Sequence, residues 1–344
     1  MRADTPPPTM RAAIITRSGG PEVLTVESRP IPEVREPSDV LVRVAHSALN
    51  RADLVQRAGR YPAPAGAPPD IPGLEFAGVV VQVGVSATRW RPGDRVFGLV
   101  PGGAHAEYLV THGDTLAPVP AALDLAAAGT LAEACITAHD ALRQSAFVPG
   151  DRVLIHAVGS GVGLAAVQLV QALGGMSIGT ARSADKLRAA HRQGLDVGIV
   201  PERGADGSPR FADTVLAATA GRGADIVLDL VGGRYVAEGL RCMAPRGRLV
   251  LIGLLDGRET TLDLGRVLTR RLQLTGTVLR TRDLDERIAY TQAFEHEVVP
   301  LLASGKVQPV VERTFELEEI AAAHAMLEGN ATTGKVALRI ARDG

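Results

Sequence analysis

Little in this sequence points to a disulfide framework, a membrane span or a nucleic-acid surface. Only two cysteines, Cys135 and Cys242, occur in 344 residues, and they lie far apart, so we expect no disulfide scaffold and a cytoplasmic protein. No apolar run approaches the roughly 18–20 residues that cross a bilayer, and the first residues lack the apolar core of a signal peptide. The net charge is −1, so we expect no nucleic-acid and no membrane partner.

The first part of the chain has the pattern of a mainly β domain. A length of 344 residues is typical of two domains, and the Pro-rich residues 1–9 are expected to be a disordered leader. From Met10 to about residue 130, short β-patterned segments such as DVLVRVAHSAL and GLEFAGVVVQVG alternate with turns, with one helix expected at Arg51–Ala58. We expect the last strand, KVALRI, to return and pair with this domain.

The pattern changes after about residue 123. The segment LDLAAAGTLAEACITAHDALRQ has helical spacing and is expected to bridge two domains. Strands and helices then alternate from Arg152 to Ile252, which predicts a parallel, doubly wound, Rossmann-like sheet. Helices are expected further on at Ile288–Leu302 and Ile320–Leu327. The predicted fold class is α/β, with the Rossmann-like domain at 131–280 and the mainly β domain at 10–130 and 281–344.

A Gly-rich turn carries the clearest chemical signal. Residues 153–169, VLIHAVGSGVGLAAVQL, read as an apolar strand, a turn and an apolar helix, which is the order of elements in a dinucleotide site. Gly159, Gly161 and Gly163, with Ser160 and Val162 between them, would let the backbone and the helix N-terminus bind a pyrophosphate. The spacing is Gly-x-Gly-x-Gly, so a tight turn in another α/β protein stays an alternative for the turn alone. The βα alternation that follows favours the dinucleotide site.

The end of the next strand bears on the choice of cofactor. NAD enzymes usually place Asp or Glu there to bind the ribose 2′-hydroxyl. Here Arg182, Ser183 and Lys186 follow the strand, and the two basic side chains would hold a 2′-phosphate while the serine hydroxyl donates to it. We therefore predict NADPH. The alternative is that Ser183 only caps a helix and the basic residues are solvated.

These residues, together with SALNRADLVQRAGRY, PGLEFAGVV, RPGDRVFGLV, AHAEYLV, LDLVGG and GTVLRTRD, make the chain similar to a known family. From Met10 onward it resembles the zinc-independent, ζ-crystallin-like quinone oxidoreductases of the medium-chain dehydrogenase/reductase superfamily. The run from His156 to Gly163 is most similar to their tumour-suppressor-inducible branch. The resemblance implies a GroES-like catalytic domain, a Rossmann-like NADP-binding domain and a nicotinamide site between them.

The resemblance also implies roles for single residues. Asn50 is expected near the nicotinamide, Gln56 and Tyr61 near the substrate, and Thr137 close to the cofactor. For Tyr61, packing on a Pro-rich loop stays an alternative. A tyrosine that stacks near the adenosine phosphate in this family is Pro201 here. The further residues expected to line the cofactor are Gly232, Gly233, Gly253, Leu254, Leu279, Arg280 and Lys335.

Zinc is not expected. Zinc alcohol dehydrogenases on this scaffold use a Cys, the His of Gly-His-Glu and a later Cys, and a catalytic zinc needs three protein ligands. The matching region of the first ligand reads Ala48-Leu49-Asn50-Arg51, the triplet is Gly73-Leu74-Glu75, and Glu133 takes the third position by spacing; leucine cannot bind a metal. Cys135 lies near the third position and is expected to be a buried helix residue.

The expected reaction is direct hydride transfer from NADPH to a small-molecule quinone or enone, without a metal. One alternative is an enoyl or acyl thioester reductase on the same scaffold. Another is an NADPH-binding structural or regulatory protein with weak turnover. A homodimer is expected, because GRLVLIGLLD and LQLTGTVL would supply edge strands across a dimer, as in relatives.

Overall fold

The computed structural model of the chain describes residues 7–341. Most of the expected leader, residues 1–9, lies outside the described residues, and Thr9 is already the first residue of a strand. The chain forms two compact units. Unit 1 contains Met1–Ile136 and Leu279–Gly344, and unit 2 contains Thr137–Val278.

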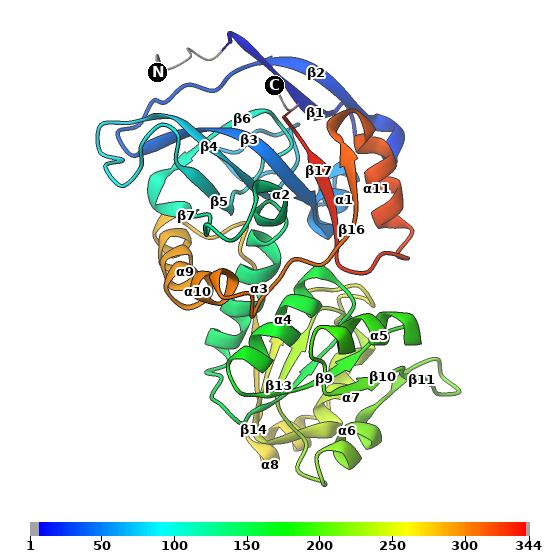
Figure 1. Cartoon of the computed structure of the whole chain (residues 1–344). Helices are drawn as coiled ribbons and strands as arrows, with labels where there is room; N and C mark the ends of the chain where they lie inside the picture. The colour runs from blue at the N-terminus through cyan, green and yellow to red at the C-terminus, as the bar shows by residue number, and fades with distance from the viewer. Residues whose placement is uncertain (1–6, 342–344) are drawn as a thin grey trace. The chain divides into compact units, whose positions relative to one another are not determined.

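Unit 1 is mainly β, and its main sheet has seven strands in the order β16-β17-β3-β4-β5-β7, with β6 also paired to β3 (Figure 1). A separate pair, β1-β2, lies antiparallel. The expected return of the last strand is confirmed, since β17 pairs antiparallel with β3. The strands are β1 (Thr9–Ile15), β2 (Leu24–Pro30), β3 (Asp39–Leu49), β4 (Glu75–Val83), β5 (Arg95–Leu99), β6 (Tyr108–His112), β7 (Leu116–Pro118), β16 (Val311–Glu316) and β17 (Lys335–Arg339).

The helices of unit 1 include two that end earlier than the sequence suggested. The expected bridging helix is two helices, because α2 ends at Ala128 with Gly129, a residue of low helix propensity, as its C-cap. The helix expected through Leu302 is also two, because Pro300 has no N–H to continue the α-helical ladder. The helices are α1 (Arg51–Arg57), α2 (Leu125–Ala128), α3 (Ala132–Gln144, which continues into unit 2), α9 (Leu284–Glu297), α10 (Val299–Ala303) and α11 (Ile320–Glu328).

Unit 2 has a six-stranded parallel sheet in the order β10-β9-β8-β13-β14-β15 (Figure 1). This is the doubly wound order of dinucleotide-binding folds, in which the strand order reverses beside the first strand. The predicted Rossmann-like α/β fold is therefore confirmed. The strands are β8 (Arg152–Ile155), β9 (Met176–Thr180), β10 (Val197–Ile199), β13 (Ala224–Asp229), β14 (Met243–Leu251) and β15 (Gln273–Gly276).

Five helices and a short hairpin complete unit 2. All six residues of β13 are buried, as expected for a central strand covered on both faces. The hairpin and α8 were not predicted. The strands of the hairpin are very short, and α8 buries no residue, so neither segment shows a clear hydrophobic period. The elements are α4 (Gly161–Ala172), α5 (Ala184–Arg192), α6 (Ala212–Ala218), α7 (Arg234–Cys242), α8 (Leu264–Arg270), β11 (Glu202–Arg203) and β12 (Pro209–Arg210). Within residues 7–341, no helix has the length and apolarity of a membrane span.

Candidate functional site

Strand pairing in unit 1 brings together polar residues that are far apart in the sequence. The antiparallel register of β17 and β3 places Val336 opposite Leu49. Lys335 comes one residue before Val336, and Asn50 comes one residue after Leu49. The start of β17 and the end of β3 therefore bring these two side chains together. Glu75 begins β4, which pairs with the other side of β3. Three separate segments therefore converge on one buried point.

The charges at this point are nearly sealed from water. Lys335 is 5% exposed and Glu75 is fully buried. The Lys335 ammonium lies 2.5 Å from a Glu75 carboxylate oxygen and 3.8 Å from a Glu133 oxygen. Burial by itself would lower the pKa of Lys335, but Glu75 and then Glu133 outweigh it, and the net pKa is raised. The lysine therefore stays protonated and neutralises buried carboxylate charge.

Asn50 has both ends of its amide engaged in this cluster. Its Oδ1 accepts from the Lys335 ammonium, and its Nδ2 donates to Glu75 at 3.0 Å. Asp53 accepts from the Asn50 backbone N–H at 2.7 Å, and this hydrogen bond caps the N-terminus of α1. The amide orientation of Asn50 is thus set by two charged neighbours.

A second cluster in unit 1 joins Gln56, Tyr61 and Arg280. The Arg280 guanidinium donates to Gln56 Oε1 at 2.6 Å and to the backbone oxygens of Pro101 at 2.7 Å and Tyr61 at 3.2 Å. Its central carbon also lies 4.7 Å from the centre of the Tyr61 ring. The structure thus brings the two predicted substrate residues together and adds Arg280, which the sequence had assigned to the cofactor.

The positions matched to zinc ligands hold other chemistry. Cys135 is buried, and burial, with a further contribution from Glu75, raises the pKa of its thiol to about 12. A thiol held protonated in this way is a poor zinc ligand, because zinc binds the thiolate. In the described part of the chain, no group of three or more His, Cys, Asp and Glu side chains is arranged to hold a metal ion. The cation beside Glu75 and Glu133 is the ammonium of Lys335.

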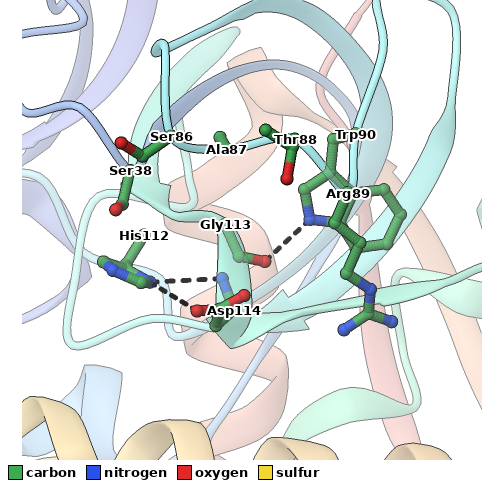
Figure 2. Close-up of a pocket in the computed structure, with 9 residues that line it drawn as sticks. All are labelled: Ser38, Ser86, Ala87, Thr88, Arg89, Trp90, His112, Gly113 and Asp114. Atoms are coloured by element: carbon green, nitrogen blue, oxygen red, sulfur yellow. Dashed lines mark hydrogen bonds and ion pairs between the residues drawn. The ribbon is translucent and has the colours of Figure 1, made fainter.

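Figure 2 shows a small pocket elsewhere in unit 1, around Trp90, His112 and Asp114. The Trp90 indole donates to the Gly113 carbonyl at 2.8 Å, and the His112 ring accepts from the Asp114 backbone N–H at 3.2 Å. None of the predicted site residues lines this pocket. Its polar groups hold one turn in place and are not part of the candidate site.

The Gly-rich turn of unit 2 has the geometry of a helix N-terminal anion site. Ser160 is the N-cap of α4, and its hydroxyl accepts from the Gly163 N–H at 3.1 Å. Gly163 is tightly enclosed, because a Cβ there would lie 2.7 Å from backbone atoms of the preceding turn. Gly161 and Val162 form the first turn of α4, where backbone N–H groups have no partner within the helix.

Basic residues lie beside this turn. A Cβ on Gly159 would lie 2.9 Å from the Lys186 Cβ, so the lysine stem occupies the space that a side chain would fill. Ser183 is the N-cap of α5 but makes no capping hydrogen bond with its side chain. Arg182 precedes it and is exposed. The structure therefore brings Lys186 and the Gly-rich turn together, with the two other predicted phosphate ligands next to them in the chain.

The strand-end loops of unit 2 also meet. Gly232 and Gly233 both have positive φ, and a Cβ on Gly232 would lie 2.9 Å from Leu254 and 3.0 Å from the Gly253 carbonyl. Asp229, which the sequence analysis did not single out, ends β13 fully buried and accepts from the Gly232 N–H at 2.8 Å. An Asp at a strand end, three residues before a Gly-Gly pair, was the available signal for this residue.

The remaining predicted residues fall on the same two units. Thr137 is the first residue of unit 2 and is 8% exposed, as is Leu279, which opens the second segment of unit 1. The predicted residues in unit 1 are Asn50, Gln56, Tyr61, Leu279, Arg280 and Lys335. Those in unit 2 are Thr137, Gly159, Ser160, Gly161, Val162, Gly163, Arg182, Ser183, Lys186, Gly232, Gly233, Gly253 and Leu254.

Two protein families match parts of the chain. Residues 36–143 match the alcohol dehydrogenase GroES-like domain, and residues 205–338 match the zinc-binding dehydrogenases. The first match confirms the expected GroES-like character of the mainly β unit.

Relatives match nearly the whole chain. A quinone oxidoreductase of Pseudomonas aeruginosa is 35% identical over 325 residues, which cover 93% of this chain and 96% of the relative. A phenolphthiocerol/phthiocerol polyketide synthase of Mycobacterium tuberculosis is 31% identical over 307 residues, 89% of this chain but 14% of that protein. The crystal structure of Escherichia coli quinone oxidoreductase complexed with NADPH has a TM-score of 0.81 and 28% identity, covering 96% of this chain and 99% of that one. The chain therefore belongs to the medium-chain dehydrogenase/reductase superfamily, in its quinone oxidoreductase branch.

Proposed function

We propose that this protein uses NADPH to reduce quinones and related electron-poor carbonyls, such as enones, by direct hydride transfer without a metal ion. The observation that carries the proposal is the packing of Lys186 against Gly159. It puts a basic side chain beside the Gly-rich turn that would bind the pyrophosphate of the cofactor. Within the family, the run from His156 to Gly163 favours the tumour-suppressor-inducible branch. We keep the domain limits at 10–130 with 281–344 and at 131–280 as part of the proposal.

The residues present fit a bound NADPH, which supplies the hydride when it is bound. The N–H groups of the first turn of α4 would hold the pyrophosphate, and the glycines there leave no side chain in the way. Arg182, Ser183 and Lys186 would hold the 2′-phosphate. A structure of the Escherichia coli relative contains NADPH, which supports the same choice here. The other proposed cofactor-lining residues are Thr137, Gly232, Gly233, Gly253, Leu254, Leu279 and Lys335.

In unit 1, the proposed catalytic roles follow from the contacts. Lys335 and Glu75 hold the Asn50 amide in one orientation, and Asn50 would lie near the nicotinamide. Gln56 and Tyr61 would face the acceptor, and the Tyr61 hydroxyl would supply the proton that completes the reduction. Burial raises the pKa of Tyr61, which keeps the hydroxyl protonated and able to donate at neutral pH.

The test follows the absorbance of the reduced nicotinamide while the purified, chelator-treated protein receives NADPH or NADH and an ortho-quinone. We expect NADPH to be oxidised, and Arg182→Ala and Lys186→Ala to raise the KM for NADPH by about 10–100-fold, the effect of losing one charged hydrogen bond. Arg192→Ala, at an exposed arginine on the same helix as Lys186, is the matched control and should leave the KM unchanged. Activity that chelator abolishes and zinc restores would contradict the metal-free mechanism.

A second candidate is reduction of an enoyl thioester. The match to a polyketide synthase is the observation that favours it. The two are separated by offering crotonyl thioesters alongside quinones, since a thioester reductase would prefer the former. Tight NADPH binding with no turnover of quinones, enones or thioesters would instead indicate a structural or regulatory NADPH-binding protein.

We also propose a cytoplasmic homodimer that uses the outer edge of the unit 2 sheet. All four residues of the edge strand β15 are exposed, which leaves a row of backbone groups able to pair with another strand. Near it in the sequence, α8 buries none of its residues, and Leu264 and Leu268 are 71% and 77% exposed. Light scattering should give twice the mass of the chain, and Leu268→Glu should halve it. A monomeric wild type would contradict the dimer.

A further inference from the structure

Arg280 carries a buried positive charge that no carboxylate neutralises directly. The residue is 7% exposed. Its three hydrogen bonds go to uncharged oxygens of Gln56, Tyr61 and Pro101. In residues 7–341, no carboxylate oxygen lies within 4.0 Å of its guanidinium nitrogens, and Asp53 acts on it only from a greater distance. Burial accordingly lowers the pKa of Arg280.

The other buried cations of unit 1 are neutralised. Arg57 lies 3.0 Å from both carboxylate oxygens of Glu328, and Lys335 lies 2.5 Å from Glu75. Taking a charge out of water is costly unless a partner of opposite charge compensates it. Arg280 is therefore the buried cation whose charge is still available to a ligand. Its neighbours Gln56 and Tyr61 are the residues proposed to face the acceptor.

We propose that Arg280 is a positioning residue of the reduction site, which holds Gln56 and Tyr61 in place and stabilises negative charge that forms on the acceptor oxygen. The inference rests on the proposed quinone or enone reduction. It narrows the substrate class to acceptors in which hydride addition leaves an oxyanion. A positive charge fixed beforehand in a buried site stabilises such an anion without having to reorient.

The reaction balances with groups already named. NADPH provides a hydride, which forms a new bond to the acceptor and moves a π-electron pair onto the acceptor oxygen. NADPH is thereby oxidised, and the quinone or enone becomes a hydroquinone or enolate monoanion. The anion takes the proton of the Tyr61 hydroxyl, and the tyrosinate regains a proton from water. Arg280 favours both anions in turn, because it lies over the Tyr61 ring and beside the proposed acceptor site.

Tyr61 gives a readout that does not depend on turnover. Burial raises its pKa, the positive charge of Arg280 opposes this, and Glu133 adds to the increase. Removal of the Arg280 charge should therefore raise the Tyr61 pKa further. Carbon-13 labelling of the tyrosine Cζ resolves the phenol titrations by NMR, with Tyr61→Phe to assign the Tyr61 signal.

The experiment compares Arg280→Met with two other variants at the same position. Arg280→Met should raise the Tyr61 pKa and lower kcat for an ortho-quinone by about 100–1,000-fold, the usual cost of removing one group that stabilises an oxyanion, with the KM for NADPH unchanged. Arg280→Gln removes the charge but keeps an amide donor. It should also raise the Tyr61 pKa and lower kcat, and it serves as the neutral variant if Arg280→Met fails to fold. Arg280→Lys keeps the charge and should restore the Tyr61 pKa and part of kcat.

The matched control is Arg313→Met. Arg313 also stacks on an aromatic ring of unit 1, 4.4 Å from the centre of Phe315, but it is exposed on β16. It should change neither the Tyr61 titration nor kcat. If the wild type reduces quinones while the neutral variants at position 280 keep both kcat and the Tyr61 pKa, the role of Arg280 is overturned and the proposed function stands. If the wild type reduces no quinone or enone, the proposed function and the oxyanion role both fall.

Discussion

In unit 1, Arg57, Arg280 and Lys335 are all less than 8% exposed, whereas among residues 137–278 no arginine or lysine is buried to that degree. Both units bury carboxylates, but in unit 2 the basic partners of the buried carboxylates are partly exposed arginines. Asp151, for example, accepts from the partly exposed Arg248 at 3.0 Å. Three basic side chains of unit 1 are therefore kept away from water, whereas every arginine and lysine of unit 2 is at least partly exposed.

The difference fits the two tasks that we propose. A pyrophosphate is charged before it binds, so a row of backbone N–H groups at a helix N-terminus suffices to hold it. An acceptor oxygen becomes negative only during the reaction. A cation that is already fixed in a region of low dielectric stabilises that charge best, because it need not reorient when the charge appears. The buried cation therefore lies in unit 1, where we propose that negative charge develops on the acceptor oxygen.

The largest expected effect comes from removing a neutralised cation of unit 1. Lys335→Met leaves Glu75 buried without its ammonium partner, and we expect the free energy of unfolding to fall by about 3–5 kcal/mol, the usual result of breaking a buried pair on one side. Urea unfolding is followed by the fluorescence of Trp90, the only tryptophan, which lies in unit 1.

The control for this variant is the exposed Lys306→Met, which should unfold with the wild type. The double variant Lys335→Met/Glu75→Gln removes both charges and should recover a large part of the loss. If the single Lys335→Met variant were as stable as the wild type, the Lys335–Glu75 pair would not be a buried charge pair in solution.

The same contrast decides how much of each site the sequence could predict. In unit 2, the strand, the turn and the helix of the proposed phosphate site are contiguous, so the pattern from Val153 to Leu169 was sufficient to predict these elements. In unit 1, the Lys335–Asn50 hydrogen bond joins residues that are 285 positions apart. The sequence predicted that the last strand pairs with the first domain, but not the register that puts Lys335 beside Asn50, because register depends on packing over the whole sheet.

Local exceptions to the predicted elements also have tertiary causes. The bridging helix is interrupted at Gly129, where the backbone lies so close to His46 of β3 that only glycine fits. The contacts of Arg280 could not be predicted from the sequence for a similar reason. Its partners Gln56, Tyr61 and Pro101 all come from the first segment of unit 1, more than 170 residues earlier in the chain.

A smaller effect on stability should follow from adding a side chain at Gly163, in the Gly-rich turn of unit 2. The Cβ of Gly163→Ala would lie 2.7 Å from backbone atoms that cannot move aside easily, so we expect a loss of about 1–3 kcal/mol in the free energy of unfolding. NADPH binding should weaken as well, because α4 would shift at its N-terminus. Gly239→Ala, in α7 of the same unit, is the matched control.

At Gly239, no atom lies closer than 3.9 Å to the new Cβ, so the higher helix propensity of alanine should dominate and stabilise unit 2 by up to about 1 kcal/mol. Far-UV circular dichroism during urea unfolding measures both changes. Equal effects of the two substitutions would mean that the close approach at Gly163 is not maintained in solution.

The stability of unit 1 should also depend on pH through the buried His324. Burial, together with the positive charge of Arg57 and the nearby His105, lowers the pKa of His324 to about 2. The unfolded chain binds a proton at His324 below about pH 6.5 while the folded chain does not, so stability should fall as the pH drops below that value. Between about pH 7.5 and 5.5 the wild type should lose about 1.4 kcal/mol more than His324→Asn, which keeps an acceptor but cannot be protonated. His296→Asn, at an exposed histidine of α9, should follow the wild type. Urea midpoints from Trp90 fluorescence at both pH values measure the difference, and parallel curves for His324→Asn and the wild type would show that His324 accepts a proton in the folded protein.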